Sequence, residues 1–218
     1  MAQPKDYTDF NTAYLNADLT FDDNGIYWVY EGETLEGKTN QTFEVMMAWE
    51  QPIMDKMADL CVSEGDDVLE IGFGMGILSD AIQAKKPASH TIIECHKDII
   101  PKLKTWADTP VDGFTKNVKI IEGSWVDVNS QFGKYDAILQ DTYADLNKYA
   151  FKELIRVYGR EGCKVTYWNS TEVLHTTLDF DDDVEFHEVS VNPPSNQYFN
   201  KTIYKVPLMI KTTQTLLI

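Results

Sequence analysis

Cysteine is scarce in this sequence, with Cys61, Cys95 and Cys163 the only three in 218 residues. They are scattered along the chain, and none falls in a C-x-x-C spacing. This odd set argues against a disulfide framework and a cysteine zinc site, and the four histidines show no metal spacing either. We therefore expect free thiols in a reducing compartment and no bound metal.

Basic residues are also few, with 19 Lys and Arg against 35 Asp and Glu. The resulting net charge of −16 repels the phosphates of a nucleic acid and attracts a cationic substrate. An alternative interpretation is that the charge only keeps the protein soluble. In either case, nucleic acid is not an expected partner.

Long hydrophobic runs are absent as well. No apolar stretch approaches the ~20 residues that a membrane span needs. The first residues, MAQPKDYTDF, lack the apolar core of a signal peptide. We expect a cytoplasmic protein with no membrane partner, and the sequence gives no indication of its oligomeric state.

The sequence does contain short apolar runs that alternate with helical patterns. Strands are expected at 67–71, 90–94, 118–121, 135–140, 164–168, 184–191 and 201–210, and helices at 77–85, 98–106 and 147–158. Strands and helices in alternation predict an α/β fold, with a mostly parallel seven-stranded sheet and helices on both faces. The last two strands, joined by NPPSNQ, are expected to form an antiparallel hairpin.

The N-terminal part shows a different pattern of apolar residues. Residues 1–40 lack strong periodicity, and we expect an arm, loosely structured apart from one hairpin near 26–30, that packs on a domain spanning 41–218 and is a candidate lid. From Thr42 the apolar residues fit a helical period until Pro52, which favours the first turn of a new helix. We therefore expect two helices with a break at Glu50–Gln51.

A glycine-rich turn, LEIGFGMG (69–76), follows the first strand of the alternating region. Gly72, Gly74 and Gly76 permit a tight turn that a ligand can approach closely. The nicotinamide fingerprint places its third glycine where this chain has Ile77, whereas Glu70 would be unfavourable beside phosphates but suits an ammonium group. The pattern favours S-adenosylmethionine over NAD, with Glu94 at the end of the next strand as the ribose ligand.

Asp141 directly follows the apolar strand YDAILQ (135–140). A carboxylate at this position commonly serves as a helix N-cap. It would equally lie near the methyl group of a cofactor bound at the glycine turn, because the two strands are neighbours in folds of this kind. Both interpretations are open from this stretch alone.

Several longer motifs resemble guanidinoacetate N-methyltransferase and its relatives that methylate arginine side chains. They occur in the family's order: VMMAWEQPIM (45–54), DVLEIGFGMGI (67–77), TIIECH (91–96), GSWVDV (123–128), YDAILQDTY (135–143), VTYWNST (165–171) and KVPLMI (205–210). The resemblance implies a Rossmann-like class I methyltransferase that uses S-adenosylmethionine and releases S-adenosylhomocysteine.

The resemblance also implies roles for individual residues. Glu50 and Asp141 would hold the guanidinium of the substrate, and Ser170 and Thr171 would receive its carboxylate. The cofactor would contact residues from four motifs: Met46, Met54, Glu70, Gly72, Phe73, Gly74, Met75, Gly76, Ile77, Glu94, Cys95, His96, Trp125 and Val126.

The implied substrate is a small cationic guanidino compound resembling guanidinoacetate. Two carboxylates can grip a planar guanidinium on two edges, and Asp141 would accept a proton from the attacking nitrogen during methyl transfer while Glu50 stays ionised. Two alternatives remain, methylation of arginine side chains in proteins and a non-catalytic cofactor-binding module. The segment 171–184 is shorter than in the family, which could open a groove for a peptide.

Overall fold

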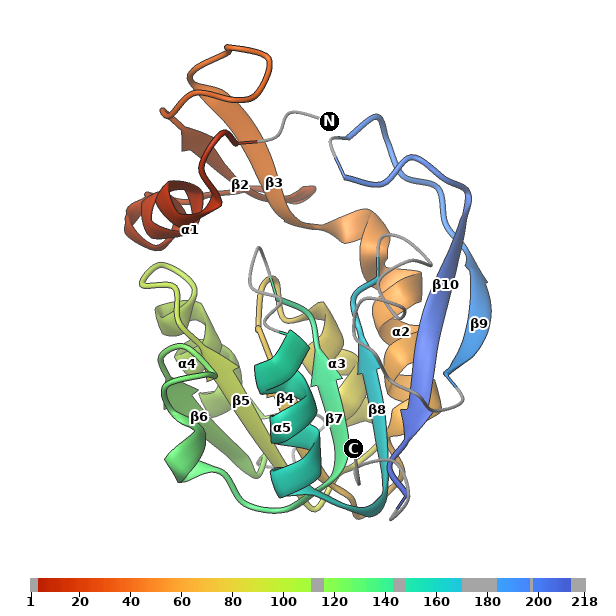
Figure 1. The fold of residues 1–218 in the computed structure, drawn as a ribbon. Helices are drawn as coiled ribbons and strands as arrows, with labels where there is room; N and C mark the ends of the chain where they lie inside the picture. The colour runs from red at the N-terminus through yellow and green to blue at the C-terminus, as the bar shows by residue number, and fades with distance from the viewer. Residues whose placement is uncertain (1–3, 111–115, 143–147, 170–183, 197, 213–218) are drawn as a thin grey trace.

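The computed structural model of this protein describes residues 4–110, 116–142, 148–169, 184–196 and 198–212. Within these ranges the chain forms a three-stranded sheet near its N-terminus and a seven-stranded sheet in the remainder (Figure 1). No helix in the described ranges is both long enough and apolar enough to cross a membrane.

The seven-stranded sheet has the order β6-β5-β4-β7-β8-β10-β9. Its strands are β4 (Asp67–Ile71), β5 (Ser89–Glu94), β6 (Val118–Glu122), β7 (Tyr135–Gln140), β8 (Gly159–Tyr167), β9 (Glu185–Ser190) and β10 (Ile203–Ile210). Strands β4 to β8 pair in parallel, whereas β10 is antiparallel to both β8 and β9. The predicted α/β fold with its C-terminal antiparallel hairpin is therefore confirmed.

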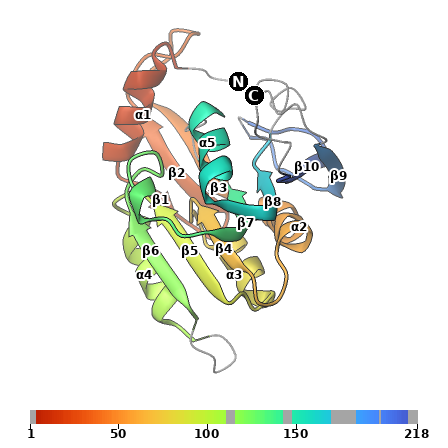
Figure 2. The same cartoon turned by 60° about the horizontal axis from the view of Figure 1, so that its bottom comes forward.

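Helices cover both faces of this sheet (Figures 1 and 2). They are α2 (Gln51–Cys61), α3 (Ile77–Ala84), α4 (Ile100–Asp108) and α5 (Lys148–Tyr158), with short 3-10 turns η1 (Ala48–Glu50) and η2 (Asn129–Gln131). Successive residues of a strand point to opposite faces. In β4, Val68 joins the core beneath α2, α3 and α4, and Leu69 and Ile71 join the core beneath α5.

The strand order reverses at β4, which has β5 on one side and β7 on the other. Ile71, the last residue of β4, pairs with Gln140, the last residue of β7. The turns that follow both strands therefore begin side by side at the carboxyl ends of the parallel strands. In open α/β sheets this reversal point is where ligands bind.

The N-terminal module (residues 4–47) is a folded unit, so the expectation of a loosely structured arm is wrong. It contains α1 (Tyr7–Asn16), β1 (Thr20–Phe21), β2 (Gly25–Tyr30) and β3 (Gln41–Met47). Phe10 of α1 meets the rings of Trp28, Tyr30 and Phe43 edge-on at 4.9, 5.0 and 5.0 Å. This aromatic core explains how a short, polar segment stays folded.

The helix expected from Thr42 is also wrong, because residues 41–47 form β3, which pairs with β2 from Gly25↔Met47 to Tyr30↔Gln41. Thr42, Phe43 and Val45 are β-branched or aromatic, and such residues are enriched in strands. Their partner strand is β2, which the helical spacing of the local sequence did not predict. The break before α2 is confirmed, with Pro52 in the first turn of that helix.

We expect Phe10→Ala to unfold the N-terminal module while the seven-stranded sheet stays folded. Truncating a buried phenylalanine costs about 3–5 kcal/mol, and Phe10 joins α1 to β2 and β3 of the module. Hydrogen exchange should lose protection in β2 and β3 but not in β4. Leu35→Ala is the matched control, since Leu35 is 59% exposed in the same module. Equal loss of protection in β4 would contradict this independence.

Candidate active site

The glycine turn after β4 lies against the start of the segment after β7. Gly72 donates its N–H to Ile93 O at 2.9 Å, and Asp141 donates its N–H to Ile71 O at 2.9 Å. Gly72 has a φ of +91°, and a Cβ placed there would lie 2.0 Å from Asp141 O. The close approach therefore requires glycine at this position and holds Asp141 beside the turn.

Glu50 ends η1 and immediately precedes α2. Its side chain is 3% exposed and folds back, so that Oε1 accepts the N–H of Met47 at 2.8 Å. The same oxygen accepts a hydrogen bond from the hydroxyl of Tyr198. The predicted break before α2 therefore directs the Glu50 carboxylate into the protein interior.

The Asp141 carboxylate acts electrostatically on Glu50. Burial, followed by the nearby Asp141 carboxylate, raises the pKa of Glu50 to about 8, although the hydrogen bonds from Tyr198 and Met47 act in the opposite direction. Burial, followed by the Glu70 carboxylate, raises the pKa of Asp141 to about 7. The two acids predicted to share one site are therefore close in space.

No ion pair in the described part of the chain joins a Lys or Arg to either of these carboxylates. Buried carboxylates are normally paired with a cation or protonated. Glu50 is buried and Asp141 is half-buried. Because the pair has no Lys or Arg partner among the described residues, it is suited to bind a cation that comes from outside the chain.

Glu70 lies on the α3 side of β4 and is fully buried. Its Oε2 accepts the hydroxyl of Ser79 at 2.7 Å and lies 2.8 Å from Nε2 of His90. Burial raises the pKa of Glu70, and the contacts with His90 and Ser79 lower it. Within the described ranges, its Oε1 has no hydrogen-bond partner. The ammonium-binding role expected for Glu70 stays a prediction.

Glu94 ends β5 and joins that strand to the glycine turn. Its Oε2 accepts the N–H of Phe73 at 3.0 Å, and its Oε1 accepts the N–H groups of Cys95 and His96, each at 2.8 Å. Cys95 is exposed, whereas His96 is buried and its Nε2 lies 3.0 Å from Tyr14 O. The chain thus places the three residues of this motif together beside the turn.

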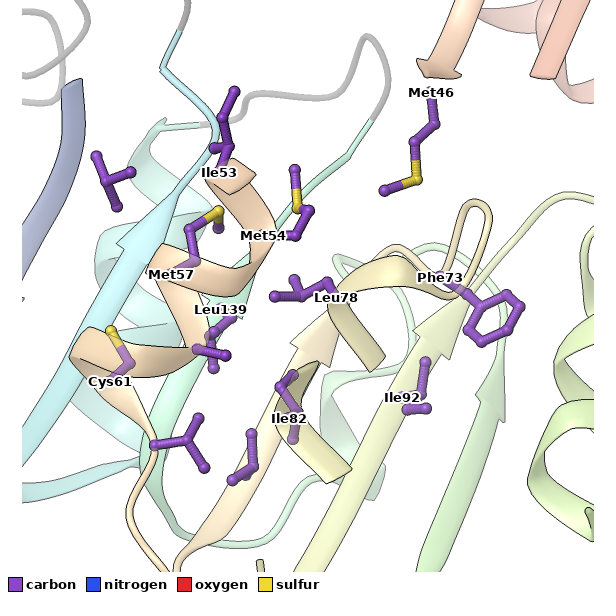
Figure 3. Close-up of a cluster of buried hydrophobic side chains, with 14 of the residues drawn as sticks. Met46, Ile53, Met54, Met57, Cys61, Phe73, Leu78, Ile82, Ile92 and Leu139 are labelled. Carbon is purple, nitrogen blue, oxygen red and sulfur yellow. The ribbon is translucent and has the colours of Figure 1, made fainter. Parts of the chain in front are cut away.

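Two methionines predicted to contact the cofactor lie near the same turn (Figure 3). Met46 reaches down from β3, and its Sδ accepts the N–H of Met75 at 3.1 Å. A Cβ on Gly74 would lie 2.3 Å from this sulfur. Met54, in the first turns of α2, is fully buried in the adjoining core. The N-terminal module therefore touches the glycine turn through one flexible side chain.

The remaining predicted residues lie at the margins of this region. Gly76, with a φ of +80°, caps α3, and Ile77 begins that helix. Trp125 is 4% exposed and contacts Phe151 edge-on at 6.2 Å, and its buried Nε1 has no partner in the described part of the chain. Val126 beside it is half-buried. Ser170 and Thr171 lie outside the described residues.

Sequence reasoning missed a group of aromatic side chains around Glu50. Trp49 stacks on Tyr198 at 5.8 Å and on Phe199 at 5.9 Å, and Trp168 stacks on Tyr204 at 4.8 Å. These rings come from η1, from the end of β8, from β10 and from the segment before it. Their only signal in the sequence was the local richness in aromatics, which is typical of cores as well as sites.

Asn169 was also missed. It follows β8, is 3% exposed, and neither its Oδ1 nor its Nδ2 has a partner among the residues that the structure describes. Its N–H donates to the hydroxyl of Tyr204, and the Asp141 and Glu50 carboxylates contribute to raising the pKa of that tyrosine, after burial. A buried amide that has no partner among the described residues, and that lies next to a tyrosine influenced by both carboxylates, is a further candidate contact for a polar ligand.

Comparison with known proteins gives a consistent result. The family model described as guanidinoacetate N-methyltransferase matches residues 37–173, more than half of the chain. A protein arginine N-methyltransferase 2 from Emericella nidulans is 31% identical over 91% of this chain and 50% of its own length. One from Yarrowia lipolytica is 36% identical over 61% of this chain and 27% of its own length. The chain spans half or less of the length of these curated relatives.

Solved structures share the fold at low sequence identity. Spermidine synthase from Thermotoga maritima has a TM-score of 0.56 at 10% identity, over 88% of this chain and 72% of its own. The C-terminal domain of a precorrin methyltransferase from Rhodobacter capsulatus has a TM-score of 0.53 at 16% identity, over 71% and 84%. On the strength of the family match, the chain belongs to the guanidinoacetate N-methyltransferase family.

Proposed function

We propose that this chain is an S-adenosylmethionine-dependent N-methyltransferase that acts on a guanidino nitrogen of a small molecule resembling guanidinoacetate. The observation that carries the proposal is the pair of carboxylates, Glu50 and Asp141, which interact electrostatically beside the glycine turn and lack a Lys or Arg partner among the described residues. A guanidinium is planar, always charged near neutral pH and suited to bind two carboxylates at once.

The residues around the turn fit the cofactor. Gly72 and Gly74 leave the backbone open at positions where a Cβ would collide, and Met46, which covers Gly74, is flexible enough to move. Glu94 accepts three N–H groups, and a carboxylate has about four acceptor positions, so capacity remains for a ribose hydroxyl. Bound here, S-adenosylmethionine supplies the methyl group.

The two carboxylates have separate tasks in this proposal. Glu50 accepts N–H groups of the guanidinium and remains ionised. Asp141 holds a second edge and takes the proton that the nitrogen must release when it gains a methyl group. The raised pKa of Asp141 in the free protein suits a group that has to hold a proton for part of the cycle.

Methylation of arginine side chains in proteins is the second candidate, and the names of the curated relatives favour it. The protein should be incubated with S-adenosylmethionine and, separately, guanidinoacetate, free arginine and arginyl peptides, and product mass should be measured. A gain of one or two methyl groups on small compounds supports the main proposal, whereas methylation of peptides alone supports the second. No methylation of any of them contradicts both.

We expect guanidinium binding to release protons near neutral pH. At about pH 7 the free carboxyls, with pKa values of about 8 and about 7, are partly protonated, and a bound cation favours their ionised forms. Affinity should rise from about pH 6 to about pH 8. Titration calorimetry in two buffers of different ionisation enthalpy measures the release, and identical heats in both buffers would contradict it.

The same pKa values give the sign of a stability effect. The folded-state values exceed the values of about 4 for unfolded carboxyls, so the pair favours the folded state most at low pH. That contribution is lost as the pH rises through about 7 and about 8. A guanidino ligand should therefore raise the melting temperature more at about pH 8 than at about pH 6.

For the domain organisation, we propose a cover formed by residues 1–40 over a methyltransferase domain spanning 41–218. Two contacts of the N-terminal module support a covering position: the ring of Tyr14 meets that of His96 at a tilted angle with centroids 4.8 Å apart, and Leu19 N–H donates to Asp98 Oδ2 at 2.9 Å. β3 extends to Met47 and belongs to the three-stranded sheet. The covering unit therefore also includes the first residues of the 41–218 range, up to Met47.

A further inference from the structure

Tyr198 reaches Glu50 across 148 positions of sequence. It lies between β9 and β10, whereas Glu50 lies between β3 and α2. The phenol hydroxyl donates a hydrogen bond to Oε1 of the carboxylate, the same oxygen that accepts the N–H of Met47. Within the described part of the chain, Oε2 of Glu50 accepts no hydrogen bond, so one oxygen is held and the other is left for a ligand.

The segment that carries Tyr198 is built as a turn around Asn196. The Oδ1 of Asn196 accepts the N–H groups of Tyr198 at 3.0 Å and Phe199 at 2.7 Å, and its Nδ2 donates to Phe199 O at 2.6 Å. Asn200 Nδ2 donates back to Asn196 O at 3.1 Å. Such asparagine side chains fix nearby backbone groups, so the backbone of Tyr198 is held to Asn196.

The ring of Tyr198 is held from two sides. Trp49 stacks on it with centroids 5.8 Å apart at an interplanar angle of 30°, and Trp168 meets it at 5.9 Å and 64°. Trp49 is next to Glu50 in sequence, so the carboxylate and the face of the phenol are fixed by the same turn. A side chain confined in this way loses little further entropy when the site is used.

We propose that Tyr198 is a positioning residue of this site, whose hydroxyl fixes one oxygen of the Glu50 carboxylate and leaves the other for the substrate cation. The inference rests on the proposed function only for the identity of that cation. It makes the substrate site depend on the segment between β9 and β10 as well as on the ends of the parallel strands.

A phenol is well suited to this position because it donates a hydrogen bond without adding positive charge. A lysine or arginine would neutralise Glu50 and compete with a cationic substrate. Burial, followed by the neighbouring Glu50 carboxylate, raises the pKa of Tyr198 well above its usual value, so the hydroxyl stays a donor. The other ionisable groups around this contact are Asp141, Glu44 and Tyr204, all neutral or acidic.

Tyr198→Phe removes the hydroxyl and keeps the ring in its stack. The ¹³C carboxyl titration of Glu50 should then move to higher pH, because the charged form loses a donor. With guanidinoacetate or an arginyl peptide, kcat/KM should fall about tenfold to a hundredfold, chiefly through KM. The increase of kcat/KM with pH should occur at higher pH in this variant, so that raising the pH partly restores activity. S-adenosylhomocysteine affinity should not change.

Tyr30→Phe is the matched control, since Tyr30 also donates to a carboxylate, Asp9, at 2.8 Å, but within the N-terminal module. It should leave the Glu50 titration and KM as in wild type. An unchanged Glu50 titration in Tyr198→Phe overturns the positioning role whatever the activity. If the wild type methylates no guanidino compound and the Glu50 titration still shifts, the contact is upheld and the proposed function alone fails.

Discussion

The Asp141→Asn variant should lose about 10²–10⁴-fold in kcat for guanidino methylation and keep its affinity for S-adenosylhomocysteine. Asparagine has nearly the same shape, so the hydrogen bond from Asp141 N–H to Ile71 O and the contact with Gly72 can persist. The variant loses the negative charge that helps hold the guanidinium and the acceptor for its proton. Steady-state kinetics and calorimetry with S-adenosylhomocysteine measure the two effects separately.

The same variant should be more stable than the wild type at about pH 8. Its carboxylate is charged there although burial and Glu70 oppose the charge, so the wild-type fold carries an unfavourable interaction that asparagine removes. Urea denaturation at about pH 8 tests this. Loss of activity with a gain in stability is expected of a functional residue and not of a structural cap.

Asp136→Asn is the control for the substitution, because Asp136 lies near the start of β7 and Asp141 directly follows the end of that strand. Its Oδ2 accepts Asp67 N–H at 2.9 Å and pairs with Arg160 at 2.5 Å, so asparagine there costs stability but should leave kcat unchanged. If Asp141→Asn turns over a guanidino substrate at a rate within a few fold of the wild type, the proton-acceptor role is wrong.

The local features of this site were predictable from the sequence. Alternating glycines after an apolar strand form a turn through short-range backbone sterics. Asp141 follows β7, which pairs with β4 in the parallel sheet, so its side chain is expected at the same edge of the sheet as the glycine turn. The break at Glu50 was likewise a local effect of Pro52. These signals lie within a few residues of the feature they predict.

The missed features depend on distant partners. Tyr198 has no local pattern that points to Glu50, and His90 has none that points to Glu70, since each pair meets only after the sheet has formed. Residues 41–47 have a spacing compatible with a helix and became a strand because β2 pairs with them. Here tertiary pairing overrode the periodicity of a short window.

Gly72→Ala should be the most damaging small substitution in the chain, because it tests the contact that places Asp141 beside the turn. At a φ of +91° an alanine is strained by about 1–2 kcal/mol, and its Cβ would lie 2.0 Å from Asp141 O. No Cβ tolerates that distance, so the backbone after β4 or β7 must shift, which costs about 1–3 kcal/mol or more in addition. We expect lower stability and at least about tenfold weaker S-adenosylhomocysteine binding.

Gly65→Ala separates the backbone strain at positive φ from the collision of the added Cβ. Gly65 has a φ of +89°, nearly that of Gly72, but a Cβ there meets no atom within 4 Å. It should show the conformational cost alone, with cofactor affinity unchanged. The difference between the variants in urea denaturation and in calorimetry is then the cost of moving the two strand ends apart. If Gly72→Ala behaves like Gly65→Ala in both measurements, the close approach of the turn to Asp141 does not hold the site together.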